Sequence, residues 1–148
     1  MFGSILVGTD GSDTATTAVR YAIDLAHQLG ARLQIVSAYE PVSRQRLRHE
    51  SIEAPSDVQW MVNPREDVLA LLDRAAAEAR SAGVADVDTF ARQGDAADAI
   101  IDVAEEVRSD LIVVGNRGMT GAKRFLLGSV PDKVSHHAPC SVLIVRTT

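Results

Sequence analysis

Glycines and basic side chains gather in one stretch near the end of the sequence. An apolar run, Leu111 to Val114, leads into it, and it holds Gly115, Arg117, Gly118, Gly121, Lys123, Arg124 and Gly128. Glycine lets backbone N–H groups come close to a ligand, and the first N–H groups of a helix attract anions. Pro131 suits the first turn of a helix, where a missing N–H costs nothing. The stretch therefore predicts a phosphate-binding loop followed by a helix.

The spacing of these glycines differs from two common phosphate-binding loops. A Walker loop would need a glycine at Thr120, and the GxGxxG dinucleotide motif fails because two residues separate the first two glycines. The sequence instead reads G-x2-G-x9-G-S, from Gly115 through Gly118 to Gly128 and Ser129. A glycine-rich connection with ordinary surface bases stays the alternative, since short motifs also arise by chance.

This spacing, together with the segment SVPDKVSHHAPCSVLIVR that follows it, resembles the nucleotide-binding signature of the universal stress protein family. The opening residues 5–12, ILVGTDGS, resemble that family's first strand and turn. The resemblance covers essentially the whole chain. It implies a single adenine-nucleotide-binding domain over residues 1–148, with strand order 3-2-1-4-5.

The resemblance and the expected strand ends together give a set of nucleotide-binding residues. They are Gly8, Thr9, Asp10, Ala38, Gly115, Asn116, Arg117, Gly118, Lys123, Gly128, Ser129 and Val130. The glycines, Ser129 and Val130 match the phosphate motif, and Ala38 matches the position whose backbone faces adenine. Asp10 is placed to accept hydrogen bonds from ribose hydroxyls. Plainer roles stay open: Asp10 as a turn residue at a helix entry, Ser129 as a helix cap, and the bases as surface charges.

Composition supports a small anionic ligand. The chain has 148 residues, of which 46% are apolar, so one domain with an aliphatic core is expected. Its net charge is −5, which argues against general nucleic-acid binding. Residues 115–148 hold five bases and one acid, a net +4, so the rest of the chain carries −9. A local basic excess in an acidic protein suits a small anion better than a long polyanion.

The sequence also predicts where the protein works. No apolar run approaches the roughly 18 residues of a membrane span. The first residues lack the basic region of a secretory signal and enter a strand at once. The single cysteine, Cys140, excludes an internal disulfide and is compatible with a reducing compartment. We expect a cytoplasmic protein without nucleic-acid or membrane partners.

Hydrophobic periodicity predicts five strands alternating with four helices. The strands are expected over residues 4–9, 33–39, 87–93, 111–114 and 141–145. The helices are expected to begin near Ser12, near Asn63-Pro64 with the asparagine as cap and the proline in the first turn, and near Asp95; the last is expected from about Ser129 to His137. Leu29 continues the apolar spacing of the first helix, and Leu69 belongs to the buried stripe of the second. Strands separated by helices form a parallel sheet covered on both faces, an open doubly wound α/β fold.

Residues 40–64 carry prolines and arginines without a hydrophobic period. A connection of this length is either a solvated insertion or a functional loop, and we expect residues 41–60 to be mobile and to order in part on ligand binding. Neither interpretation is favoured by the sequence.

The chemistry expected from these residues is binding more than catalysis. His136, His137 and Cys140 lack the spacing of a metal site, and no Walker lysine or catalytic triad is recognisable. The leading hypothesis is a stress-response or regulatory protein that holds ATP, AMP or cyclic AMP, with Mg²⁺ as a companion of ATP. The alternatives are a weak ATPase or phosphotransferase on the same scaffold and a flavin or electron-transfer relative. An apolar edge strand, Ser141 to Val145, predicts a homodimer.

Overall fold

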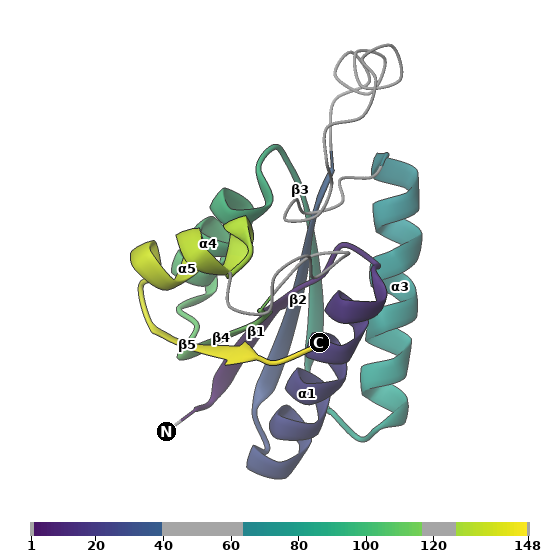
Figure 1. Cartoon of the computed structure of the whole chain (residues 1–148). Coiled ribbons are helices and arrows are strands. Elements are labelled where there is room, and N and C mark those ends of the chain that lie inside the picture. Colours follow the sequence, from purple (N-terminus) through teal and green to yellow (C-terminus); the bar gives the residue numbers. More distant parts are fainter. Residues whose placement is uncertain (1, 40–63, 117–126, 148) are drawn as a thin grey trace.

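A computed structural model describes residues 2–39, 64–116 and 127–147 of the chain. Its ribbon is a five-stranded sheet between two layers of helices (Figure 1). In chain order the elements are β1 (Ser4–Gly8), α1 (Asp13–Leu29), β2 (Arg32–Tyr39), α3 (Arg65–Ser81), β3 (Val87–Gln93), α4 (Ala96–Val107), β4 (Leu111–Gly115), α5 (Ser129–His137) and β5 (Ser141–Val145). Residues 40–63 and 117–126, which include the expected mobile segment, lie outside the described ranges.

The sheet is parallel throughout and its strand order is β3-β2-β1-β4-β5, which confirms the predicted fold class and order. The central strand β1 pairs with β2 on one side, where Gly8 lies opposite Val36. On its other side it pairs with β4, where Val7 lies opposite Val113. The chain leaves β1 toward one edge of the sheet and leaves β4 toward the other, so the strand order reverses between them.

Two apolar cores lie on the two faces of the sheet. Helices α1 and α3 cover one face, and α4 and α5 cover the other (Figure 1). The strands β1 and β4 are buried along their whole lengths, as their continuous apolar sequences predict. The buried face of α1 is mostly alanine, which lets this helix lie close to the sheet: Ala15, Ala18, Val19, Ala22, Ile23 and Ala26.

Helix ends follow local sequence signals. Ser12 caps α1 by accepting a hydrogen bond from the Ala15 N–H, and Gly30 ends this helix with a left-handed φ of 63°. Asp95 caps α4 through the N–H of Asp98. Helix α5 has Gly128 at its N-cap, so no side chain bonds its first N–H groups from that position.

Four local expectations need correction. Pro64 is the N-cap of α3 and not a residue of its first turn. Ser129 is the first residue of α5, so it does not cap this helix. Leu29 and Leu69 are 51% and 38% exposed, although both follow the apolar spacing of their helices. Leu29 is the last residue of α1, where the helix runs out, and Leu69 lies at the margin of the apolar face of α3. Helical period alone does not show that either side chain is left exposed.

Candidate functional site

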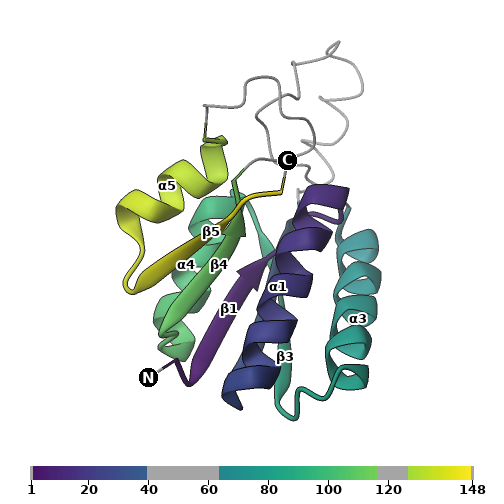
Figure 2. The same ribbon diagram turned by 60° about the horizontal axis from the view of Figure 1, so that its bottom comes forward.

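The carboxyl ends of β1 and β4 lie side by side at one edge of the sheet, where the strand order reverses. Open α/β sheets bind ligands at such a point, because the loops leaving the two strands diverge and leave a crevice. Figure 2 shows this edge, with the start of α1 and the chain's C-terminus near the end of β4. The structure therefore brings Gly8, Thr9 and Asp10 to the same edge as Gly115 and Asn116.

The turn after β1 is held by its own side chains. Thr9 and Asp10 are each only 1% exposed. The Gly11 N–H donates to Thr9 Oγ1 at 3.2 Å, and the Ser12 N–H donates to Asp10 Oδ1 at 2.9 Å. Gly11 has a φ of +83°, a conformation that glycine adopts without strain. Asp10 is thus a turn residue at the helix entry, and its carboxylate is held in place at the carboxyl end of β1 by that bond.

The end of β2 presents backbone groups to the same crevice. Val36 O accepts the Thr9 N–H at 3.0 Å, so the Val36 carbonyl points toward β1. Tyr39 O accepts the Gly94 N–H at 2.9 Å, on the side of β3. Backbone groups alternate between the two sides of a strand, so the N–H and C=O of Ala38 point toward β1, as those of Val36 do. Since β1 ends at Gly8, opposite Val36, these two groups of Ala38 extend past it.

Asn116 connects three segments directly after β4. Its N–H donates to Val145 O at 2.9 Å, and its own carbonyl accepts the Gly128 N–H at 2.9 Å. Its side-chain Oδ1 accepts both the N–H and the hydroxyl of Thr147, each at 2.9 Å. Asn116 therefore ties the end of β4 to the chain after β5 and to the N-cap of α5.

The start of α5 is the remaining part of the site. The Gly128 N–H is used by Asn116, and Gly128 O accepts the Asp132 N–H at 3.0 Å. The first N–H groups of the helix are those of Ser129 and Val130, because Pro131 has none. The helix dipole makes this end positive, and glycine at the N-cap leaves room for a ligand oxygen where other helices place a side chain.

The expected site residues divide into two groups. Nine of them lie in the described ranges and meet at this edge of the sheet: Gly8, Thr9, Asp10, Ala38, Gly115, Asn116, Gly128, Ser129 and Val130. Arg117, Gly118 and Lys123 lie outside those ranges. Thr147, which contacts Asn116, was missed by sequence reasoning because a threonine after the last strand carries no motif.

A wide acidic cleft of about 860 Å³ lies elsewhere, along α4 and the end of β3. Its charged lining residues are Arg92, Asp95, Asp98, Asp102, Glu105 and Glu106. Arg92 is already paired with Glu106 at 2.9 Å. The net charge of these lining side chains is negative and would repel a phosphate, so this cleft is a poor candidate for the anion site.

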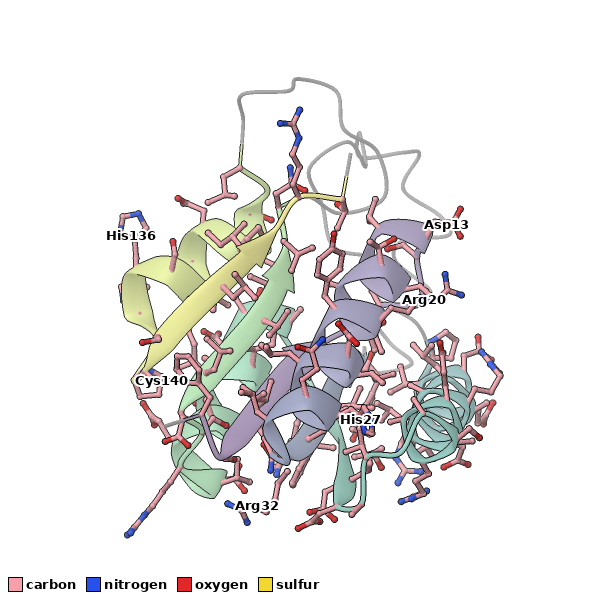
Figure 3. The ribbon with its side chains drawn as sticks, turned by 90° about the horizontal axis from the view of Figure 1, so that it is seen from below. Asp13, Arg20, His27, Arg32, His136 and Cys140 are labelled. Carbon is pink, nitrogen blue, oxygen red and sulfur yellow. The ribbon has the colours of Figure 1, made fainter. Side chains whose placement is uncertain are left out.

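The histidines and the cysteine of the C-terminal segment do not converge. His136 lies on α5 and Cys140 precedes β5 (Figure 3). Within residues 2–39, 64–116 and 127–147, no group of three or more His, Cys, Asp and Glu side chains could hold a metal ion. Burial raises the pKa of the Cys140 thiol, with a smaller effect of the Asp110 charge, so this thiol is a weak nucleophile at neutral pH. Among the described helices, none is long and apolar enough to cross a membrane.

The fold defines an open doubly wound α/β protein, whose topological switch point lies between β1 and β4. The sequence profile of the universal stress protein family matches residues 1–146. This chain belongs to the universal stress protein family.

Individual relatives agree with this assignment. Universal stress protein Rv1636 of Mycobacterium tuberculosis is 37% identical over 150 residues, covering 99% of this chain and 98% of the relative. A putative universal stress protein of Staphylococcus aureus, SAUSA300_1656, is 34% identical over 147 residues, covering 99% and 85%. A crystal structure of a universal stress protein in complex with cAMP superposes with a TM-score of 0.73 at 34% identity, covering 98% of this chain and 97% of that one.

Proposed function

We propose that this protein binds an adenine nucleotide at the carboxyl edge of β1 and β4, in a stress-response or regulatory role. ATP is the expected occupant, with AMP and cyclic AMP as alternatives. One observation carries the proposal: a helix start with glycine at its N-cap, Gly128, lies at the same sheet edge as the Asp10 carboxylate. The relative solved with cAMP, at 34% identity over nearly the whole chain, supports the same ligand class.

Each part of a nucleotide has a matching group at this edge. The N–H and C=O of Ala38 are a donor and an acceptor side by side, which suits the hydrogen-bonding edge of adenine. Asp10, whose Oδ1 is bound to the Ser12 N–H, supplies carboxylate oxygens for the ribose hydroxyls. Ser129 and Val130 supply the positive helix end for a phosphate. Gly118, Arg117 and Lys123 complete the phosphate site by their place in the motif. Mg²⁺ would accompany ATP through its phosphates.

Two experiments test the proposal. Mass spectrometry of the small molecules released from the purified, denatured protein identifies the bound occupant. Calorimetry with ATP, AMP and cyclic AMP then compares wild type with Gly118→Val and Lys123→Ala. Gly118→Val should weaken all three ligands by blocking backbone approach, and Lys123→Ala should weaken ATP more than AMP. Unchanged affinities in Gly118→Val would show that the phosphate site is misplaced.

The same purified protein distinguishes binding from turnover. A binding protein retains its nucleotide unchanged over many minutes, whereas a weak ATPase or phosphotransferase releases ADP. A yellow preparation with flavin absorbance would instead support the electron-transfer alternative. We also propose a cytoplasmic location, because the single cysteine, Cys140, is compatible with a reducing compartment.

We further propose a homodimer formed through β5. This strand is the outermost strand on one side of the sheet. Its Leu143 and Ile144 are 39% and 37% exposed. Apolar side chains on an open edge favour pairing with a second copy. Leu143→Glu should shift the protein to a monomer in light scattering without unfolding it, because Leu143 is already exposed. Leu69→Glu on α3 is the matched control, since Leu69 is 38% exposed away from β5.

A further inference from the structure

We infer that Thr147 is a positioning residue for the nucleotide site, acting through Asn116 on the start of α5. This inference rests on the proposed function. Thr147 lies two residues beyond β5, and both its N–H and its hydroxyl donate to Asn116 Oδ1 at 2.9 Å. The backbone carbonyl of the same asparagine accepts the Gly128 N–H. One residue thus joins the chain's final segment to the N-cap of the anion-binding helix.

The hydrogen-bonding chemistry fixes the asparagine amide. A backbone N–H can only donate, so the atom that faces Thr147 must be the amide oxygen. The second donor, the Thr147 hydroxyl, reinforces that orientation. With Oδ1 held in this way, the side chain cannot rotate without losing two hydrogen bonds. Its backbone is held as well, by the bond from the Asn116 N–H to Val145 O.

The consequence for α5 follows from where the helix is anchored. Gly128 donates to the Asn116 carbonyl at 2.9 Å, so the N-cap is fixed relative to the end of β4 by that bond. The rest of α5 packs against α4 and β5 through Val130 and Val134. A shift of Asn116 therefore moves the N-cap against a helix body that stays packed. A phosphate held by the first N–H groups of α5 is sensitive to such a shift, because hydrogen bonds weaken steeply with misalignment.

The contribution of Thr147 has an upper bound. A neutral hydrogen bond contributes about 1 kcal/mol net, so removing one lowers nucleotide affinity by at most about five-fold. By linkage, bound nucleotide should protect the Thr147 N–H from exchange to the same extent. These two effects are the measurable signs of coupling between the final segment and the site.

Thr147→Val tests the inference, because it removes the hydroxyl and keeps the backbone N–H and the branched shape. Amide exchange followed by NMR in the nucleotide-free protein should be faster at Gly128 than in wild type. Calorimetry should show ATP affinity lowered about two- to five-fold. Thr147→Ser, which keeps a hydroxyl, should restore both values. Thr17→Val is the matched control, since it also removes a threonine hydroxyl that donates one hydrogen bond, here to the Asp13 carbonyl on α1.

A double-mutant cycle shows whether Thr147 acts through Asn116. In an Asn116→Ala background, Thr147→Val should have no further effect on affinity. Full additivity would overturn the inference, as would unchanged Gly128 exchange or unchanged affinity in Thr147→Val alone. If wild type binds no nucleotide, the proposed function fails. The exchange data then still decide whether Thr147 holds the N-cap of α5.

Discussion

The connections that follow β1 and β4 lie at the same edge of the sheet, yet they treat their helix starts differently. After β1 the chain turns within a few residues, and Ser12 caps α1 with its own hydroxyl. After β4 the helix start is reached only at Gly128, which has no side chain to offer. The start of α1 thus carries a side-chain cap bond, and the start of α5 carries none at its N-cap. The proposed anion site differs from the start of α1 in this respect.

Of the other two helices, α4 resembles α1 in its side-chain cap, whereas α3 resembles α5 in lacking one. Helix α4 is capped by Asp95, whose carboxylate accepts the Asp98 N–H. Helix α3 also lacks a side-chain cap bond, but Glu66 and Asp67 stand in its first turn. Carboxylates there satisfy the helix dipole and repel an anion. In α5 the acid of the first turn, Asp132, faces His136 at 3.4 Å, one turn along the helix.

The largest effect is expected when α5 is given a carboxylate cap like that of α4. Gly128 has φ −64° and ψ 162°, a conformation open to any residue. Gly128→Asp should raise the free energy of unfolding by about 0.5 kcal/mol through capping. It should also lower ATP affinity by about 2–3 kcal/mol, roughly 30- to 150-fold, through repulsion and blocking. Calorimetry and chemical denaturation measure the two effects, with the uncharged Gly128→Ser as control. Undiminished affinity in Gly128→Asp would place the anion elsewhere.

A second substitution tests the other connection by changing charge without changing shape. Asp10→Asn keeps an oxygen for the Ser12 N–H but removes the negative charge. A hydrogen bond to a charged group contributes about 1.5 kcal/mol or more, so ATP affinity should fall roughly ten-fold. The loss should disappear with 2′,3′-dideoxy-ATP, which lacks the ribose hydroxyls. An equal loss with both ligands in calorimetry would remove Asp10 from ribose recognition and leave its turn role.

A third substitution should affect stability alone. Ser12→Ala removes the hydroxyl that caps α1 and should lower the free energy of unfolding by about 1 kcal/mol. Nucleotide affinity should stay at the wild-type value, because the α1 start is not the anion site. Urea denaturation and calorimetry check the two parts, and Ser135→Ala controls for the loss of an exposed hydroxyl that bonds Asp132 O. A large drop in affinity would mean that both helix starts bind the ligand.

The smallest effect concerns the contact between α5 and α4. Lys133 Nζ lies 2.8 Å from Asp98 Oδ1 and 3.4 Å from Asp95 Oδ2. The hydrogen bond with Asp98 raises the pKa of Lys133 above its usual 10.5. A raised lysine pKa stabilises the fold below pH 10.5, and this stabilisation is lost as pH rises through the folded-state pKa. Lys133→Met should therefore be slightly less stable than wild type at pH 7. The difference should vanish in strong alkali and shrink with salt, as denaturation curves will show.

Much of this architecture could be predicted from local signals. Continuous apolar runs predicted β1 and β4, since strands buried on both faces need no alternation. The bounds of β3, α5 and β5 were predicted correctly because turn residues flank each one. Leu69 was misplaced because its exposure depends on where α3 crosses the sheet, and a helical period does not encode that. The position of Pro64 was also predicted wrongly, because the helical period does not show at which residue α3 begins.

The backbone of the candidate site was predictable from the sequence, and its side-chain contacts were not. The glycine-rich motif predicted a strand end at Gly115 and a helix start next to Gly128, where the structure has both. The link between Asn116 and Thr147 joins residues 31 apart, through a side chain whose direction only the folded sheet determines. Many polar residues could have made that bond, so the sequence carries no signal for it.

The two ends of the chain lie at opposite ends of the sheet, with the C-terminal end near the start of α1 and the N-terminal end beside the start of β1 (Figure 2). This placement decides where a purification tag or fluorophore belongs. A group fused to the C-terminal end would lie close to Thr147 and would disturb its two hydrogen bonds to Asn116. A group fused ahead of Phe2 would be separated from the crevice by the full length of β1. The N-terminal end is therefore the better place for a label in the binding experiments.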